Sequence, residues 1–159
     1  MRHGVSNRKF REMPLIRNSG SDTISDNQQH MAIVGTGVDL IEVERVQRAL
    51  SRPATGERFR QRVFTENEIA YCESRGRPRY QSYAARFAAK EAVMKALGTG
   101  WNRHVGWNDI EVLRQRGRAP TIVLHGKAAQ FAARCGIARI HLSLNHTPSL
   151  AIAYVAAES

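Results

Sequence analysis

The stretch Arg-Phe-Ala-Ala-Lys-Glu-Ala-Val-Met-Lys-Ala-Leu-Gly-Thr-Gly, residues 86–100, decides how this chain folds. Ala, Leu, Met, Lys, Glu and Arg are strong helix formers, and no proline interrupts the chain from Arg79 to Leu97. Gly98 follows the last apolar residue, as a glycine at a helix C-terminus does. The pattern therefore predicts one long helix that ends near Leu97.

The expected helix is apolar on every side. Successive side chains are turned by about 100°, so four alanines form one flat seam that suits close packing against another backbone. These alanines are Ala85, Ala89, Ala92 and Ala96. Glu91 and Lys95 share a second face, and Arg86 and Lys90 share a third. A helix that is apolar all round is normally buried, so its charged side chains need partners.

Two interpretations of Glu91 and Lys95 are open from the helix alone. In the first interpretation, the two side chains form an ordinary i,i+4 surface ion pair, worth a few tenths of a kcal/mol. Alternatively, they line a cleft in which the carboxylate holds Mg²⁺ and the cations bind phosphate, because Mg²⁺ prefers oxygen ligands and shares them with substrate phosphates. A second carboxylate from elsewhere in the chain would favour the cleft.

Asp39 supplies that carboxylate. It lies near the end of the short, β-branched segment 32–40, which predicts a buried strand. Gly35 and Gly37 resemble part of a dinucleotide-binding loop, but Leu40 stands where the third glycine of that loop would be. The segment therefore predicts a strand that carries one acid and not a dinucleotide site.

Two motifs together resemble the family of holo-acyl-carrier-protein synthases, the short-chain 4′-phosphopantetheinyl transferases. The motifs are Gly-Thr-Gly-Val-Asp-Leu, residues 35–40, and Arg-Phe-Ala-Ala-Lys-Glu-Ala-x-x-Lys-Ala-x-Gly-Thr-Gly, residues 86–100. The similarity extends over residues 31–158, so we expect one phosphopantetheinyl transferase domain at residues 31–159.

The resemblance implies an enzyme of fatty acid biosynthesis. A serine hydroxyl of apo-acyl carrier protein attacks coenzyme A, 4′-phosphopantetheine is transferred, and adenosine 3′,5′-bisphosphate is released. Asp39 and Glu91 are expected to hold Mg²⁺, and Glu91 or a metal-bound water to accept the serine proton. Lys95 is expected to neutralise the departing bisphosphate, and Arg86 and Lys90 to contact the nucleotide phosphates of coenzyme A.

The segment Ser-Leu-Asn-His-Thr, residues 143–147, resembles a part of these enzymes that lies beside coenzyme A. His146 is therefore expected to contact a phosphate. His141 lies five residues earlier in an extended segment and so points to the opposite face. We assign His141 to packing or the surface. The remaining candidates for structural roles only are Trp101, His104 and His125.

Residues 42–52 predict an amphipathic helix that Pro53 closes. Its apolar residues are Val43, Val46 and Leu50, and its opposite face carries Arg45, Arg48 and Arg52. This face is either an ordinary solvated surface or a docking site. The resemblance implies the second: Arg45 and Arg52, helped by Arg48, dock the acidic recognition helix of acyl carrier protein.

The rest of the chain mixes helices with antiparallel strands. Thr65 and Glu68 have the spacing of a capping box at a helix start. Strands are predicted at 107–113, 121–124, 139–145 and 150–155, and a helix at 127–135. We therefore expect an α+β fold with the long helix packed on a small antiparallel sheet. The resemblance implies a homotrimer with active sites at subunit boundaries.

The net charge of +10 indicates an acidic partner, which could be nucleic acid, an anionic membrane or an acidic protein. The alternative function is therefore a small basic nucleic-acid-binding module without catalysis. That function leaves Asp39 and Glu91 unexplained, and the chain has no aromatic-rich Gly-Phe motif or GXXG loop. A passive coenzyme A binder is a third possibility, which release of adenosine 3′,5′-bisphosphate would exclude.

The cysteines, the lack of long apolar runs and the polar N-terminal segment indicate where the protein is located and where its domain begins. Cys72 and Cys135 form no CxxC arrangement, so we expect a reducing cytoplasm. No apolar run approaches the ~18–20 residues of a membrane span. Residues 1–30 are polar and lack hydrophobic periodicity, and they lack the apolar core of a secretory signal. They predict a flexible N-terminal extension.

Overall fold

The computed structural model describes residues 31–99, 105–114 and 117–159. Its elements in chain order are β1 (Ile33–Glu42), α1 (Val43–Leu50), α2 (Gly56–Val63), α3 (Glu66–Glu73), α4 (Arg79–Ala96), the 3₁₀ helix η1 (Trp107–Asp109), β2 (Ile110–Leu113), β3 (Thr121–Leu124), α5 (Gly126–Arg134), β4 (Arg139–His146) and β5 (Leu150–Glu158). The α+β prediction is confirmed. The expectations for residues 1–30, Trp101 and His104 lie outside the described residues.

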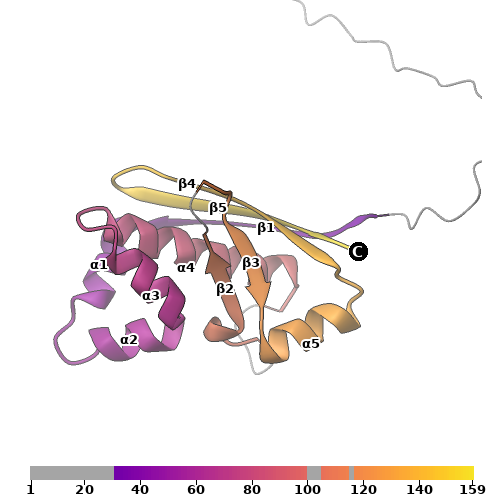
Figure 1. Cartoon of the computed structure of the whole chain (residues 1–159), viewed down its shortest axis with the longest axis horizontal. Coiled ribbons are helices and arrows are strands. Elements are labelled where there is room, and N and C mark those ends of the chain that lie inside the picture. The colour runs from indigo at the N-terminus through magenta and orange to yellow at the C-terminus, as the bar shows by residue number, and fades with distance from the viewer. Residues whose placement is uncertain (1–30, 100–104, 115–116) are drawn as a thin grey trace, which may run out of the picture.

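The main sheet has three antiparallel strands in the order β1-β5-β4. The long helix α4 runs along one face of this sheet, while α1, α2 and α3 gather at one end of it (Figure 1). On β5, the side chains that face α4 are buried, and those between them are exposed. The buried residues of β5 include Ala151, Ala153 and Val155. The long helix packed on a small antiparallel sheet is thus present as predicted.

The alanine seam explains how closely α4 approaches the sheet. A Cβ atom added at Gly37 would overlap the carbonyl oxygen of Ala92, and one added at Gly35 would overlap that of Ala96. The two glycines of the first motif therefore make room for the helix backbone. Ala92 is completely buried and Ala96 nearly so, as the predicted seam requires.

The smaller sheet pairs β2 with β3 as an antiparallel hairpin. The predicted strand at 107–113 is wrong in its first half, because residues 107–109 form η1 and only residues 110–113 form a strand. The cause is local: the Asp109 carboxylate accepts a hydrogen bond from the Gly106 N–H at 2.9 Å and closes a turn. The strand-forming side chains of this segment begin only at Ile110.

The capping box at the start of α3 is confirmed. The Glu68 N–H donates to the Thr65 hydroxyl at 3.3 Å, and the Thr65 N–H donates to the Glu68 carboxylate at 2.9 Å. Glu68 is almost completely buried, which is unusual for a capping residue. In the described part of the chain, no helix is long and apolar enough to cross a membrane.

Candidate functional site

Asp39 and Lys95 meet where the end of α4 crosses β1. The Lys95 ammonium donates to the Asp39 carboxylate and to the Val38 carbonyl, both at 2.8 Å. The Asp39 side chain is 17% exposed, whereas the Lys95 side chain is 49% exposed. Among the described residues, the ammonium of Lys95 therefore pairs with Asp39 and not with Glu91 as a simple i,i+4 pair would.

Glu91 lies close to the same charges. Burial raises the pKa of the Glu91 carboxyl, and the nearby Asp39 carboxylate raises it further, while Lys95 and Arg45 oppose this shift. Four charged side chains from β1, α1 and α4 thus act on one another at a single place. The two carboxylates that the sequence predicts to share a site are brought together by the fold.

The donors suit Mg²⁺ shared with a phosphate, and they do not suit a metal held by protein alone. Within the described residues, no group of three His, Cys, Asp or Glu side chains could hold a metal ion. Mg²⁺ commonly uses one or two carboxylates and completes its octahedron with water and substrate phosphates. The Asp39 carboxylate adds to the rise in the pKa of Glu91, so the two side chains repel each other and a cation would relieve that repulsion.

Arg86 lies in the core between α3 and α4 and is only 4% exposed. Its guanidinium stacks on the Tyr71 ring at 4.0 Å from the centroid, and it donates to the Ser82 carbonyl at 3.2 Å. The buried Nε of Arg86 has no hydrogen-bond partner among the described residues. A buried cation with an unused donor suits an anion that reaches it.

Lys90 is not placed to contact a phosphate, which corrects the prediction for this residue. Its side chain is fully buried and forms an ion pair with Glu68 at 2.7 Å. It also donates to the carbonyls of Val63 and Trp107, at 2.8 and 2.9 Å. An ammonium has three hydrogens, and these three acceptors use all of them. Helical spacing places Lys90 near Arg86 but could not reveal this buried partner.

His146 lies at the end of β4, on the opposite edge of the sheet from Asp39. In the strand register, Asp39 is opposite Ala153, whereas His146 is opposite Ala151 on the other side of β5. Two strand spacings of about 4.8 Å therefore separate their backbones, in addition to an offset along the strands. The fold does not bring His146 into contact with Asp39 within one chain.

His141, on β4, is exposed, and its Nε2 is hydrogen-bonded to the Glu158 carboxylate of β5. His125 pairs similarly with Glu111 at 2.8 Å. The sequence predicts only packing, surface or structural roles for these two histidines.

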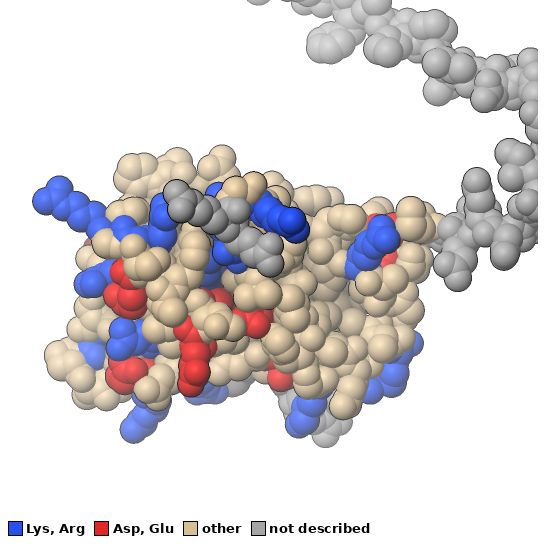
Figure 2. Space-filling model, in the orientation of Figure 1, with Lys and Arg blue, Asp and Glu red and all other residues tan. Residues whose placement is uncertain are grey.

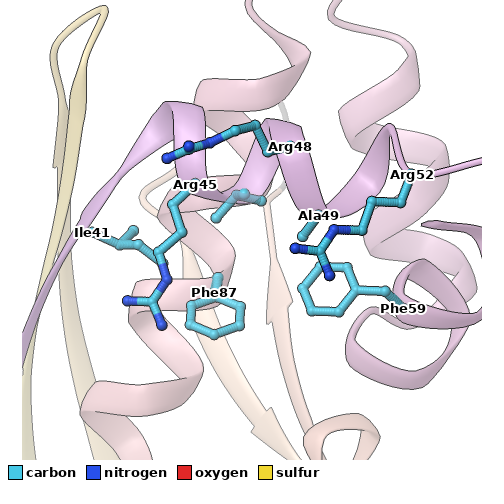
Figure 3. Close-up of a pocket in the computed structure, with 8 residues that line it drawn as sticks. Ile41, Arg45, Arg48, Ala49, Arg52, Phe59 and Phe87 are labelled. Carbon is cyan, nitrogen blue, oxygen red and sulfur yellow. The ribbon is translucent and has the colours of Figure 1, made fainter. Parts of the chain in front are cut away.

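Arg45 and Arg48 of α1, together with Arg52 just beyond its C-terminus, line one groove of about 420 Å³. Apolar side chains form the rest of its wall, and in Figure 3 the ring of Phe87 lies beside the Arg45 guanidinium and the ring of Phe59 beside that of Arg52. The lining arginines are Arg45, Arg48 and Arg52, and the other lining residues are Ile41, Val46 and Ala49. The groove is therefore cationic at its rim and apolar at its floor.

Arg45 and Phe87 connect this groove to the carboxylates. Arg45 lines the groove and also lowers the pKa of Glu91. Phe87 lies one turn before Glu91 on the same face of α4, because the two residues are four apart. A partner bound in the groove would thus lie beside the Asp39 and Glu91 carboxylates.

Sequence reasoning missed the two phenylalanines of the groove and the buried partner of Lys90. Phe59 belongs to a short helix with a mixed pattern, so nothing in its spacing indicated a shared wall with α1. Glu68 did carry a signal, because it completes the capping box of α3. That pattern predicts the position of Glu68 but gives no indication of its contact with α4.

Comparison with known proteins identifies the family. A model of the 4′-phosphopantetheinyl transferase superfamily matches residues 35–155. The chain is 50% identical over 127 residues to a holo-[acyl-carrier-protein] synthase of Solibacter usitatus, covering 80% of this chain and 99% of that protein.

Solved structures give the same result. The crystal structure of the synthase from Neisseria meningitidis superposes with a TM-score of 0.72 at 30% identity, covering 80% of this chain and 100% of that one. A synthase from Bacillus anthracis in complex with CoA (3′,5′-ADP) superposes with a TM-score of 0.65 at 34% identity, covering 80% and 97%. The chain therefore belongs to the holo-acyl-carrier-protein synthase family of the 4′-phosphopantetheinyl transferase superfamily.

Proposed function

We propose that this chain transfers 4′-phosphopantetheine from coenzyme A to a serine of apo-acyl carrier protein, in support of fatty acid biosynthesis. The observation that carries the proposal is the cluster of Asp39, Glu91 and Lys95 beside a groove lined by three arginines. The family membership and the coenzyme A complex of the relative from Bacillus anthracis support coenzyme A as the donor.

Asp39 and Glu91 are the residues that would hold Mg²⁺. Bound there with the pyrophosphate of coenzyme A, Mg²⁺ supplies stabilisation of the negative charge that develops on the phosphate oxygens. The two carboxylates of the protein fix where the reacting phosphate lies. This assignment rests on the chemistry of the two donors and on the resemblance of both motifs to those of the family.

The transfer is a substitution at the β-phosphorus. The serine oxygen forms the new bond to phosphorus, and the bond from phosphorus to the bridging oxygen breaks. The electron pair remains on that oxygen, in adenosine 3′,5′-bisphosphate. Glu91 is the candidate acceptor of the serine proton, because burial and Asp39 make its carboxylate more basic than usual. Lys95, half exposed beside Asp39, neutralises the leaving group.

Arg86 and His146 are the proposed contacts to the nucleotide phosphates. The unpartnered Nε of Arg86 supports its role, since a buried guanidinium gains most from a charge-assisted hydrogen bond. His146 is exposed at the end of β4. Lys90 is left out of this set because its ammonium has no hydrogen left to donate.

The groove on α1 is the proposed docking site for acyl carrier protein. Arg45, Arg48 and Arg52 provide the positive rim for an acidic helix, and the rings of Phe59 and Phe87 provide apolar area beneath it. Charges at a rim speed encounter, whereas the apolar floor supplies the burial that holds a complex. Docking here would present the carrier serine next to Glu91.

We also propose a homotrimer in which subunit boundaries complete the active sites. The outer face of the sheet exposes apolar side chains that a folded monomer would leave in water. They are Val38, Leu40, Leu150, Ile152 and Tyr154. His146 and Asp39 are at opposite edges of one sheet, so a neighbouring copy is the means to bring such residues together.

The alternative, a nucleic-acid-binding module, has less support. On the face shown in Figure 2, acidic side chains are interspersed with basic ones over the end formed by the small helices. Uniform cationic surfaces are typical of proteins that follow a phosphate backbone. Both cysteines are free thiols, which agrees with our proposal of a cytoplasmic enzyme.

Mass spectrometry tests the proposed function. The chain is incubated with an apo-acyl carrier protein, coenzyme A and Mg²⁺, and the carrier should gain one phosphopantetheine while adenosine 3′,5′-bisphosphate appears. Glu91→Gln is the control, and chelation of the metal should stop the gain in mass. A carrier of unchanged mass, together with tight binding of random-sequence duplex DNA, would favour the alternative.

A further inference from the structure

The Lys90 ammonium links four elements of the fold. It is carried by α4, and its three acceptors are the Val63 carbonyl at the end of α2, the Trp107 carbonyl of η1 and the Glu68 carboxylate of α3. Each acceptor has a fixed direction because it belongs to backbone or to a buried capping residue. The orientation of α4 about its own axis is therefore tied to three neighbours through one nitrogen.

Glu68 is satisfied as completely as Lys90. One of its oxygens accepts from the Val112 N–H at 2.9 Å, and the other accepts from the Thr65 N–H at 2.9 Å as well as from Lys90. Both side chains of the pair are 0% exposed. A buried ion pair loses so much hydration that an apolar pair of the same size is often equally stable. Stability alone thus gives little reason for this pair.

On its other side, α4 packs closely against the sheet. There the contact is made by alanines against the glycine backbone of β1, including Ala92 against Gly37. Small side chains permit close approach but provide no interlocking shapes that oppose rotation or sliding. Lys90 directly precedes Glu91, and Lys95 follows one turn later. A small rotation of α4 would turn both away from Asp39.

We propose that Lys90, with Glu68, is a positioning residue: its buried ammonium sets the rotation of α4 and so directs Glu91 and Lys95 toward Asp39. This inference rests on the proposed transferase function. It predicts that the geometry of the carboxylate site depends on Lys90 even when the cost of the buried charge has been removed.

The test compares Lys90→Met with the double variant Glu68→Gln/Lys90→Met. The single variant leaves Glu68 unpaired, so it should melt well below wild type. The double variant has no unpaired charge and should regain part of that stability. The Val63 and Trp107 carbonyls still lose their donor, and Glu68→Gln leaves only one oxygen to accept from the Thr65 and Val112 N–H groups. Val155→Ala, a buried change on β5, is the matched control for lost stability. Each protein is assayed below its melting temperature, and Mn²⁺ binding in the presence of coenzyme A is followed by electron paramagnetic resonance.

We expect the double variant to show kcat and Mn²⁺ affinity both reduced about tenfold or more, as for other residues that orient metal ligands. Its KM for the carrier should change less than kcat, because Arg45, Arg48 and Arg52 are unchanged and only Phe87 of the groove moves with α4. Val155→Ala should keep both kcat and Mn²⁺ affinity. If neither Met variant folds, Lys90→Arg, which keeps the charge but not three donors on one nitrogen, is measured in the same way.

A double variant with wild-type kcat and Mn²⁺ affinity would overturn the inference, and so would a Val155→Ala control that loses them equally. Failure of the proposed function is distinguishable, because wild-type protein itself would then transfer no phosphopantetheine. In that case Mn²⁺ binding still measures whether Lys90 positions the two carboxylates.

Discussion

At the scale of single residues, the site depends on two carboxylates that the fold holds unfavourably close. Glu91 is less acidic than an ordinary glutamate because it is partly buried and near Asp39. Lys95 and Arg45 lower that cost without removing it. Such an arrangement is costly in the folded protein and useful for binding a cation or accepting a proton. We therefore expect Asp39 and Glu91 to be needed for turnover and not for stability.

Asp39→Asn and Glu91→Gln should each reduce turnover by about a hundredfold or more, because each keeps the shape but removes an anionic oxygen. Glu91→Gln should melt at or above the wild-type temperature at neutral pH. With its pKa raised in the folded state, Glu91 favours folding when protonated and loses that contribution as the pH rises through its folded pKa. The difference in melting temperature should therefore shrink in acid. Near-normal rates in either variant would contradict the assignment.

The pH dependence of turnover should report on Glu91. Because its carboxylate must be ionised to accept a proton, kcat should fall in acid at a pH above the usual range of a glutamate. Arg45→Gln removes a charge that lowers the pKa of Glu91, so the acid limb should move to higher pH. The control is Arg48→Gln, measured at saturating carrier: it removes a groove arginine that is not among the charges acting on Glu91. An identical shift in both variants would argue against Glu91.

At the scale of elements, the backbones of α4 and β1 approach each other closely at Gly37. Gly37→Ala should destabilise the fold by about 1–3 kcal/mol, because its Cβ would overlap the Ala92 carbonyl oxygen. Thr36→Ala is the matched control, since Thr36 is exposed on the neighbouring position of the same strand. Denaturant unfolding measures both. A Gly37→Ala protein as stable as wild type would mean that α4 can move away without cost.

The face of α1 makes a separate prediction. Reversal of Arg45 and Arg52 to Glu should raise the KM for the carrier about tenfold or more, and the defect should shrink at high salt. The KM for coenzyme A should change much less. Lys127→Glu with Arg134→Glu, on exposed positions of α5, changes the net charge equally and serves as control. If both pairs raise the carrier KM alike, the overall charge is responsible and the groove is not the docking site.

At the scale of the whole molecule, the exposed apolar face of the sheet predicts self-association. Light scattering should give a mass three times the 17.8 kDa of one chain. Val38 and Tyr154 are both about half exposed. The double variant Val38→Lys/Tyr154→Lys should shift the measured mass toward that of one chain and reduce turnover. A wild-type monomer at micromolar concentration would exclude the trimer.

Mixing of inactive variants tests whether the sites are shared between copies. Asp39→Asn and His146→Ala are each expected to be inactive or weak alone. If His146 serves the site of a neighbouring copy, mixed assemblies contain some sites with both residues intact, and activity should return in part. No recovery after subunit exchange would contradict the proposal that His146 serves the site of a neighbouring copy.

The sequence alone determined much of this fold, because helices, caps and turns depend mainly on residues that are close together in the chain. The long α4, the capping box of Thr65 and Glu68 and the final hairpin around residues 147–149 follow from propensity, side-chain spacing and turn residues. The amphipathic α1 follows in the same way, since Val43 and Val46 are buried as their spacing predicts. Asp39 and Glu91 were found through motifs that are contiguous in the chain.

Only the tertiary structure decided which charges meet. Lys90 and Arg86 share a helix face, yet all three hydrogens of the Lys90 ammonium go to acceptors in α2, α3 and η1, whereas the Arg86 Nε has no hydrogen-bond partner within the described part of the chain. Lys95 lies four residues from Glu91 but pairs with Asp39, which is 56 residues away. Helical periodicity fixes the direction in which a side chain leaves the helix axis. Its partner depends on which distant element packs against that face of the helix. Desolvation and hydrogen bonding to that element then determine whether a charge serves the core or a ligand.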